Sequence, residues 1–182
     1  MQKTTTRIVG PLIGLALSIT SSFAATNVEI TLIDKLDEPR GFCLDIVGSK
    51  HKAVPARGLQ AHTCYSYQGD IAVDQGFSAD SAKDGIFLLP WFNICMTLSD
   101  ARPGSPLSLK ACDGGPQQQF TFTANGAIVF NTDPSLCLTV NDGASRSGGG
   151  GKPVHLIRRL SVERCNQALA KFQIWRMRAN TD

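Results

Sequence analysis

One short pattern of residues occurs three times in the chain, and its polar position differs between the copies. The pattern is a cysteine followed by an apolar, a polar and a second apolar residue, found in GFCLDIVG (41–48), NICMTLSD (93–100) and SLCLTVND (135–142). The polar position is Asp45 in the first copy, but Thr97 and Thr139 in the other two. A carboxylate can accept hydrogen bonds from two neighbouring hydroxyl groups, and such charge-assisted bonds are about twice as strong as neutral ones. Asp45 can therefore do chemistry that the two threonines cannot supply.

Four more polar side chains accompany Asp45 in the first copy. The segment LQAHTC contains Gln60 and His62, which are two residues apart and so project to the same face of an extended strand. Asp74 and Gln75 follow further along the chain. An aspartate in a glycine-rich segment can also cap a turn, and a histidine in a strand can be an ordinary exposed residue. The occurrence of these groups together favours a binding site over those alternatives.

The N-terminal residues are predicted to be an export signal and not part of the fold. Lys3 and Arg7 precede an apolar run over 8–19, and small residues near Ala24 suit cleavage after that position. The run is too short to span a bilayer, and its lack of a polar face disfavours an amphipathic helix. We therefore predict a signal peptide over 1–24 and a secreted protein, located outside the cell or in a periplasm.

The composition of the mature chain, 25–182, excludes several classes of function. It has 158 residues, enough for one domain with a core, and loss of Lys3 and Arg7 changes the formal net charge from +3 to +1. A nearly neutral chain gives no electrostatic reason to bind nucleic acid or an anionic membrane. No second apolar stretch has the length of a membrane span. Serine-hydrolase and metalloprotease motifs do not occur, so we predict that the protein is not an enzyme.

All six cysteines lie in the mature chain: Cys43, Cys64, Cys95, Cys112, Cys137 and Cys165. An even number of cysteines behind an export signal favours disulfides. Zinc is disfavoured because neither CxxC nor HxxxH spacing occurs and the histidines are far apart. We therefore expect no metal or other cofactor. Six cysteines permit 15 pairings, and their number alone does not choose among them.

Three units with the same order of features follow one another, at about 27–84, 85–125 and 126–182 of a single domain. Each has an opening cysteine, a closing cysteine and then a Gln-x-aromatic ending: Gln75–Phe77, Gln118–Phe120 and Gln173–Trp175. Short segments rich in β-branched and aromatic residues, separated by glycine and proline, are typical of strands. An internal triplication of short strands favours an all-β barrel with threefold symmetry.

The repeated unit, Cys-Leu-Asp-Ile followed by Leu-Gln-x-aromatic-x-Cys and Gln-x-Trp, resembles the ricin B-type lectin repeat. The resemblance covers nearly the whole mature chain, because each Gln-x-aromatic ending follows a cysteine pair in the family's order. It implies a β-trefoil with one disulfide inside each repeat: Cys43–Cys64, Cys95–Cys112 and Cys137–Cys165. It also implies that the aromatic residues of the endings fill the core, while their glutamines satisfy nearby polar groups.

The same resemblance implies a carbohydrate-binding site in the first repeat, formed by Asp45, Gln60, His62, Asp74 and Gln75. Asp45 matches the carboxylate of the family's binding repeats, and Gln75 matches the residue that braces it. His62 stands where the family usually has a stacking tryptophan or tyrosine, so we expect weaker binding that can respond to pH. Asp74 replaces a usual asparagine and cannot donate a hydrogen bond, which argues against an assignment to galactose.

The corresponding positions of the other repeats offer no ring together with an acid: Ser108 and Lys110 in the second repeat, and Ser161 and Glu163 in the third. We therefore expect one shallow, open site that binds a glycan non-covalently. Useful avidity would require several copies or a partner. Two alternatives stay open. One is a β-trefoil subunit that binds protein in a toxin or adhesin complex after loss of its sugar sites. The other is a protease inhibitor with a protruding loop at 64–75 or 99–106.

Overall fold

The structure, a computed structural model, describes residues 26–179, and the predicted signal peptide lies outside this range. Strands dominate the described part: β1 (Asn27–Leu32), β2 (Phe42–Ile46), β3 (Leu59–Thr63), β4 (Phe77–Ser78), β5 (Leu88–Leu89), β6 (Ile94–Thr97), β7 (Ser108–Ala111), β8 (Phe120–Phe122), β9 (Ile128–Phe130), β10 (Asp133–Val140), β11 (Arg146–Ser147), β12 (Leu156–Arg158), β13 (Leu160–Arg164) and β14 (Trp175–Arg178). The helices are short: α1 (Ala79–Lys83), α2 (Ala170–Gln173) and the 3₁₀ turns η1 (Lys50–Lys52), η2 (Pro55–Arg57), η3 (Ser66–Gln68), η4 (Pro116–Gln118) and η5 (Gln167–Leu169).

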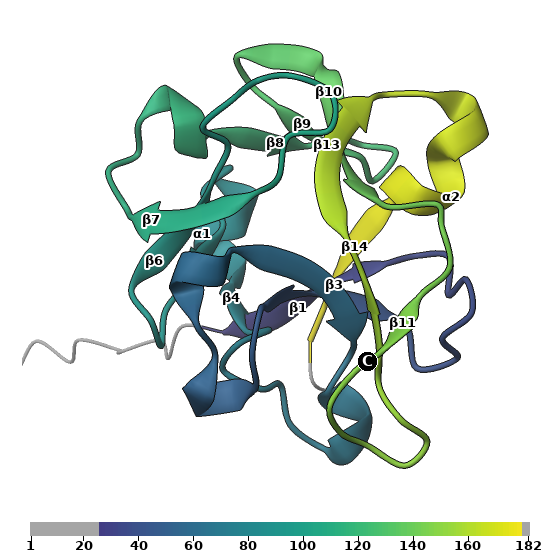
Figure 1. The fold of residues 1–182 in the computed structure, drawn as a ribbon. Coiled ribbons are helices and arrows are strands. Elements are labelled where there is room, and N and C mark those ends of the chain that lie inside the picture. Colours follow the sequence, from purple (N-terminus) through teal and green to yellow (C-terminus); the bar gives the residue numbers. More distant parts are fainter. Residues whose placement is uncertain (1–25, 180–182) are drawn as a thin grey trace, which may run out of the picture.

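Three antiparallel strand pairs, one from each repeat, lie around a common centre (Figure 1). They are β2–β3, β6–β7 and β10–β13. The barrel is closed by β1, which pairs with β14 over Glu29↔Arg178 to Leu32↔Trp175. Each of the three pairs forms within one repeat, so the threefold order of the sequence becomes a threefold order in space. The expected all-β fold is confirmed.

The register of the three pairs aligns the repeats as the sequence predicted. In each pair, the polar residue of the opening pattern lies opposite the position four residues before the closing cysteine: Asp45↔Gln60, Thr97↔Ser108 and Thr139↔Ser161. The longer third repeat keeps this register because its extra residues lie in the connection before β12, between β10 and β13.

The glutamine of each Gln-x-aromatic ending makes the same three contacts, which we call the glutamine clasp. Its Nε2 donates to the polar residue of the opening pattern and to the carbonyl just before the closing cysteine. Its Oε1 accepts from the backbone N–H of the residue that follows the closing cysteine. The Nε2 distances are 2.9 Å from Gln75 to Asp45 Oδ2, 3.2 Å from Gln118 to Thr97 Oγ1 and 2.9 Å from Gln173 to Thr139 Oγ1. The carbonyl partners are Thr63, Ala111 and Arg164, and the N–H partners are Tyr65, Asp113 and Asn166.

The predicted disulfides are confirmed. Cys43–Cys64, Cys95–Cys112 and Cys137–Cys165 join residues 21, 17 and 28 positions apart. Each bridge links the opening strand of a repeat to the end of its partner strand, beside the glutamine clasp. The covalent link and the clasp therefore fix the same point of each repeat.

The aromatic residues of the three endings are buried, as expected for residues of the core. Phe77, Phe120 and Trp175 are at most 1% exposed. Phe87 connects the first two, with ring centroids 6.3 Å from Phe77 and 5.9 Å from Phe120 in edge-on geometry. Trp175 also donates its indole N–H to Leu138 O at 3.0 Å, which satisfies the polar atom that its burial would otherwise leave unpaired.

The third repeat adds a small hairpin, β11–β12, to the sheet of the first repeat. β12 pairs with β3 through Ile157↔His62 and Arg158↔Ala61. The glycine-rich connection between β11 and β12 is held by hydrogen bonds between Gly148 N and His155 O at 2.6 Å and between His155 N and Gly150 O at 2.7 Å. Sequence from the third repeat therefore covers one edge of the first.

Candidate functional site

The strand pair β2–β3 brings Asp45, Gln60 and His62 together. Asp45 lies opposite Gln60 in the register, and the Gln60 Nε2 donates to Asp45 Oδ1 at 2.7 Å. Gln75 donates to the other carboxylate oxygen as part of the clasp. Both oxygens of Asp45 are thus held by amides. Burial above all, and then the nearby Asp74 carboxylate, raise the pKa of Asp45 well above its ordinary value.

Asp74 lies beside Asp45 and has one carboxylate oxygen without a partner. The Asp74 backbone carbonyl accepts from Ile46 N at 3.0 Å, which fixes it against the end of β2. Oδ2 accepts from the backbone N–H of Lys50, whereas the buried Oδ1 has no hydrogen-bond partner. Burial raises the pKa of Asp74, against the lowering effect of the bond from Lys50. An unpaired buried acceptor is unusual in a folded protein and calls for an explanation.

His62 is a neutral ring at the edge of this group. Its Nδ1 lies 2.8 Å from the carbonyl of Thr63 and 3.5 Å from the amide nitrogen of Gln75. Burial lowers the pKa of His62 to about 4, so the ring is uncharged near neutral pH. Its response to pH therefore falls in the acidic range and not near pH 6, where an exposed histidine titrates.

All five predicted residues meet, but the expectation of a shallow, open site is not met in this structure. Asp45, Gln60, His62, Asp74 and Gln75 are each at most 5% exposed. We call these five residues the first-repeat cluster. An open site is expected from the residues of one strand pair. The site is closed because residues from loops and from another repeat cover it.

Two aromatic side chains cover the cluster on the His62 side. Tyr65 lies 5.1 Å from His62 between ring centroids, and His155 of the third repeat lies 5.1 Å from His62 on an edge. His155 Nε2 is also within 2.7 Å of the hydroxyl of Tyr67. On the other side, the backbone N–H of Lys50 in η1 bonds to Asp74. The cover therefore combines η1, the 64–75 loop and the β11–β12 hairpin.

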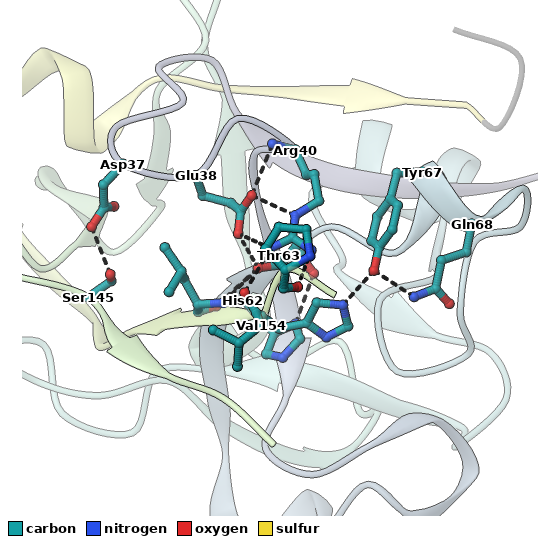
Figure 2. A network of polar contacts seen from close by, with 12 residues as sticks. Asp37, Glu38, Arg40, His62, Thr63, Tyr67, Gln68, Ser145 and Val154 are labelled. Carbon is teal, nitrogen blue, oxygen red and sulfur yellow. Dashed lines mark hydrogen bonds and ion pairs between the residues drawn. The ribbon is translucent and has the colours of Figure 1, made fainter. Parts of the chain in front are cut away.

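A buried ion pair fastens this hairpin to the first repeat (Figure 2). Glu38 accepts from Arg40 through both carboxylate oxygens, at 2.7 and 2.6 Å, and from Thr63 Oγ1 at 2.6 Å. Arg40 in turn donates to the backbone carbonyls of Pro153 and Val154, both at 2.9 Å. The hydrogen bonds from Arg40 and Thr63 lower the pKa of Glu38 although burial opposes them. The hairpin is thus tied down by charge-assisted bonds.

Several of these covering residues were not identified from the sequence. Tyr65 and Tyr67 lie in the 64–75 loop, but their role depends on His155, which is about ninety positions away. The Glu38–Arg40 pair occurs in a Pro-Gly turn and reads there as a solvated charge pair. No local pattern signals a contact between segments so far apart in the chain.

The equivalent positions of the other repeats carry different chemistry, as the sequence predicted. His62 lies opposite Cys43 in the register, and the residues in that position elsewhere are Lys110 and Glu163. Within residues 26–179, a possible metal-ligand group consists of Glu29, Cys43 and Cys64. Its two sulfur atoms form a disulfide and Glu29 pairs with Arg178 at 2.6 Å, so this group does not suit a metal.

Comparison with known proteins identifies the family. The model of the ricin-type β-trefoil lectin domain matches residues 33–157, more than half of the chain. The chain belongs to this family. The ricin B-type resemblance and the β-trefoil fold are therefore confirmed. A comparison with curated protein sequences found no match.

Solved structures of the same fold are similar over most of the domain. The agglutinin from Abrus precatorius is 20% identical, with a TM-score of 0.57. The similarity covers 87% of this chain but only 50% of the agglutinin chain. The C-half of an earthworm R-type lectin in complex with GalNAc is 17% identical with a TM-score of 0.56, covering 85% of this chain and 98% of its own. The β-trefoil lectin of the Vibrio vulnificus hemolysin/cytolysin, with N-acetyl-D-lactosamine bound, is 15% identical with a TM-score of 0.54, covering 86% and 96%. At such identities, the similarity establishes the fold. Across 26–179, no helix has the length and apolar character needed to cross a membrane.

Proposed function

We propose that the protein is a non-catalytic lectin that binds a glycan at the first-repeat cluster. Membership of the ricin-type β-trefoil lectin family supports a carbohydrate ligand, as do the sugars named with two structural relatives. In the proposed complex, Asp45 and Asp74 accept hydrogen bonds from sugar hydroxyls, and Gln60 and Gln75 orient Asp45. The ring of His62 covers part of the apolar face of the sugar.

The observation that carries this proposal is that the fold does not require a carboxylate at position 45. In the second and third repeats, Thr97 and Thr139 satisfy the same glutamine clasp with a neutral hydroxyl. A buried carboxylate costs several kcal/mol more in desolvation than a hydroxyl. The first repeat bears this cost at Asp45 and again at Asp74, whose Oδ1 is unpaired. Folding does not require the carboxylates of Asp45 and Asp74, whereas binding of a ligand through hydrogen bonds would.

Binding requires the cover to move, because no atom of the cluster is open enough to hold a sugar ring. The part of the cover that closes over Asp74 is the turn η1, which has no buried residue. Its bond to Asp74 comes from the Lys50 backbone and leaves the Lys50 side chain exposed. We infer that displacement of this turn admits the ligand and that sugar hydroxyls then replace the N–H of Lys50.

The test is the substitution Asp45→Thr, which gives the first repeat the residue that the other two repeats use. We expect the variant to fold, with the same three disulfides and a melting temperature within a few degrees of the wild type. Binding to the neutral glycans of an array should fall at least tenfold. The matched control is Asp142→Thr, which removes the same charge from an exposed position of the third repeat.

Retention of neutral-glycan binding by a folded Asp45→Thr protein would place that sugar elsewhere and refute the site. A wild-type protein that is silent across the array would instead favour a second function, a β-trefoil module that binds protein. The closed state of the cluster is the observation that favours this second function. A pull-down with immobilised wild-type protein, compared with Asp45→Thr, would then show whether a protein partner depends on the cluster.

We also propose that the protein acts after export, in an oxidising compartment. Three disulfides within 26–179 support this, because such bonds persist mainly outside the cytosol. N-terminal sequencing of the protein recovered from its native compartment should give Ala25 as the first residue. An intact Met1 on the mature protein would contradict cleavage of a signal peptide.

A further inference from the structure

A pocket lies where the three repeats meet, and it is distinct from the covered first-repeat cluster. Its volume is about 510 Å³. Val47, Leu59 and Gln60 line it from the first repeat, Gly104 and Pro106 from the second, and seven residues between Asn141 and Glu163 from the third. We call it the junction pocket. Of the first-repeat cluster, Gln60 alone is among the residues that line it.

Backbone hydrogen bonds between repeats hold the walls of the junction pocket in place. Leu59 N donates to Leu107 O at 3.2 Å, which joins the first repeat to the second. Gly104 N donates to Val162 O at 2.8 Å, which joins the second to the third. The pairing of β12 with β3 joins the third to the first. Hydrogen bonds between all three repeats therefore fix part of the wall of the pocket.

Three arginines line the junction pocket, and one of them serves the structure. Arg158 is 8% exposed and donates through Nε and Nη2 to Asp37 Oδ1, at 3.2 and 2.8 Å. Its Nη1 donates to the backbone carbonyls of Asn141 and Gly143. All three guanidinium nitrogens of Arg158 thus form hydrogen bonds, which connect the segment around Asp37 to the segment 141–143. Its charge is balanced by Asp37.

The other two arginines, Arg146 and Arg159, are exposed and form no ion pair with any residue of 26–179. Arg146 makes one long contact, with Nη2 at 3.5 Å from Gln60 Oε1. The backbone of Arg159 is fixed by a bond from Asn141 N at 2.9 Å. Two guanidinium groups with free donors at one pocket favour an anionic ligand, because arginine binds carboxylate, sulfate and phosphate in bidentate geometry.

The remaining polar groups of the pocket are suited to hydroxyls. The carboxylate of Glu163, which lines the pocket, accepts from Ser161 Oγ at 2.8 Å and has further acceptor capacity. A ligand consisting of an anion alone would gain nothing from Glu163 and would be repelled by it. A ligand with an anionic group and several hydroxyls could use the arginines and Glu163 together. Leu59, Leu160 and Pro106 add apolar surface against which a sugar ring can pack.

We propose that the junction pocket is a second carbohydrate site, which binds an acidic saccharide through Arg146 and Arg159. The anionic group, a carboxylate or a sulfate ester, pairs with the two guanidinium groups, and neighbouring hydroxyls donate to Glu163. Apart from Gln60, this site uses none of the residues of the first-repeat cluster.

The test compares three forms of one oligosaccharide: neutral, sialylated and sulfated. Binding is measured by isothermal titration with the wild-type protein and with the double variant Arg146→Gln/Arg159→Gln. We expect the wild type to bind at least one acidic form at least tenfold more tightly than the neutral form. The double variant should lose this preference. Which acidic form binds then distinguishes a carboxylate from a sulfate ester.

The matched control is Lys35→Gln/Arg176→Gln, which removes the same charge from exposed positions that do not line the pocket. It should bind the acidic form within twofold of the wild type. Asp45→Thr should also retain this binding, since the first-repeat cluster is not involved. Equal loss in the control variant would reduce the effect to net charge and overturn the proposal. So would loss in Asp45→Thr, or the absence of any preference for acidic forms in the wild type.

Discussion

At the scale of single residues, the glutamine of each clasp donates to a neutral hydroxyl in two repeats and to a carboxylate in the first. Thr97 and Thr139 accept from the clasp glutamines, and Asp45 accepts from Gln75 in their place. The cost of the acid appears in the raised pKa of Asp45 and Asp74. Burial disfavours the charged, deprotonated forms of both acids, and it disfavours the charged, protonated form of His62. The pH dependence of stability therefore has opposing parts.

The substitution Asp74→Asn should stabilise the protein at neutral pH. It removes a buried charge next to Asp45 while keeping an acceptor for the Lys50 backbone N–H. Because the folded-state pKa of Asp74 is raised, the charge destabilises the protein above about pH 4 and not below it. We expect a gain of about 1 kcal/mol in the free energy of unfolding at pH 7, which disappears near pH 4. Urea denaturation at the two pH values measures this difference.

The exposed position Asp142 provides the control for this prediction. Asp142→Asn should change the free energy of unfolding by less than about 0.5 kcal/mol. A loss of stability in Asp74→Asn at pH 7 would mean that the second oxygen of Asp74 has a partner in solution, for example a buried water molecule.

The substitution His62→Gln should reduce the acid sensitivity of the protein. The pKa of His62 is about 4 in the folded state, below its ordinary value of about 6.5. Unfolding then takes up a proton between these values, so stability falls as the pH falls from about 6.5 to 4. The loss attributable to His62 is about 2–3 kcal/mol. Free energies of unfolding measured across this range should fall less steeply in the variant, and an unchanged slope would show that His62 is not buried in solution.

At the scale of elements, the notable arrangement is the β11–β12 hairpin over a strand of another repeat. It adds two strands to the edge of β3 and places His155 against His62. Arg40 fastens it through exposed backbone carbonyls, and its contact with Tyr67 also lies at an exposed side chain. The hairpin can therefore be loosened from the outside without disturbing the core.

The substitution Tyr67→Phe should increase local opening of this hairpin while leaving the barrel intact. It removes the hydroxyl that bonds to His155 Nε2 at 2.7 Å and to Gln68 Nε2 at 2.8 Å. Loss of such a bond costs about 1 kcal/mol, or about fivefold in a local opening equilibrium. Amide hydrogen exchange of Gly148 and His155 should accelerate by that factor. Exchange in β6 and β10 should stay unchanged, as it should throughout the protein in Trp91→Phe, which alters an exposed ring elsewhere.

At the scale of the whole molecule, three similar repeats share a core but differ in how deeply they bury their covalent links. Cys43 and Cys64 are both fully buried, whereas Cys112 and Cys165 are exposed. The loops that the bridges close differ little in length, with separations of 21, 17 and 28 residues. In the chain-entropy model, such loops differ by less than about 1 kcal/mol. Packing, and not loop length, should therefore rank the three bridges.

Replacement of each cysteine pair by alanine should rank the bridges by burial. The chain-entropy contribution is about 3 kcal/mol for each. Removal of Cys43 and Cys64 also leaves unfilled space in the core, which adds about 1–2 kcal/mol. We expect the largest drop in denaturant midpoint for this pair. A larger drop for Cys137–Cys165 would indicate that loop closure, at its greatest separation of 28, dominates instead.

The sequence predicted the fold and the disulfides because both depend on a pattern within each repeat. The clasp glutamine contacts a strand residue and the carbonyl before a cysteine of its own unit, so spacing suffices to identify it. The members of the first-repeat cluster were predictable for the same reason. Its closure was not, since that depends on contacts across repeats, from His155 to His62 and from Arg40 to Pro153. The junction pocket was equally hidden, because its walls come from all three repeats.

The pairing of β1 with β14 has a consequence for how the barrel forms. The strand that begins the domain finds its partner in the strand that ends it, and the buried Glu29 meets Arg178 at that seam. While residues 175–178 are still inside a ribosome or a translocation channel, the barrel therefore cannot close. Until those residues are released, one edge of β1 offers unsatisfied amides and carbonyls to any neighbouring chain.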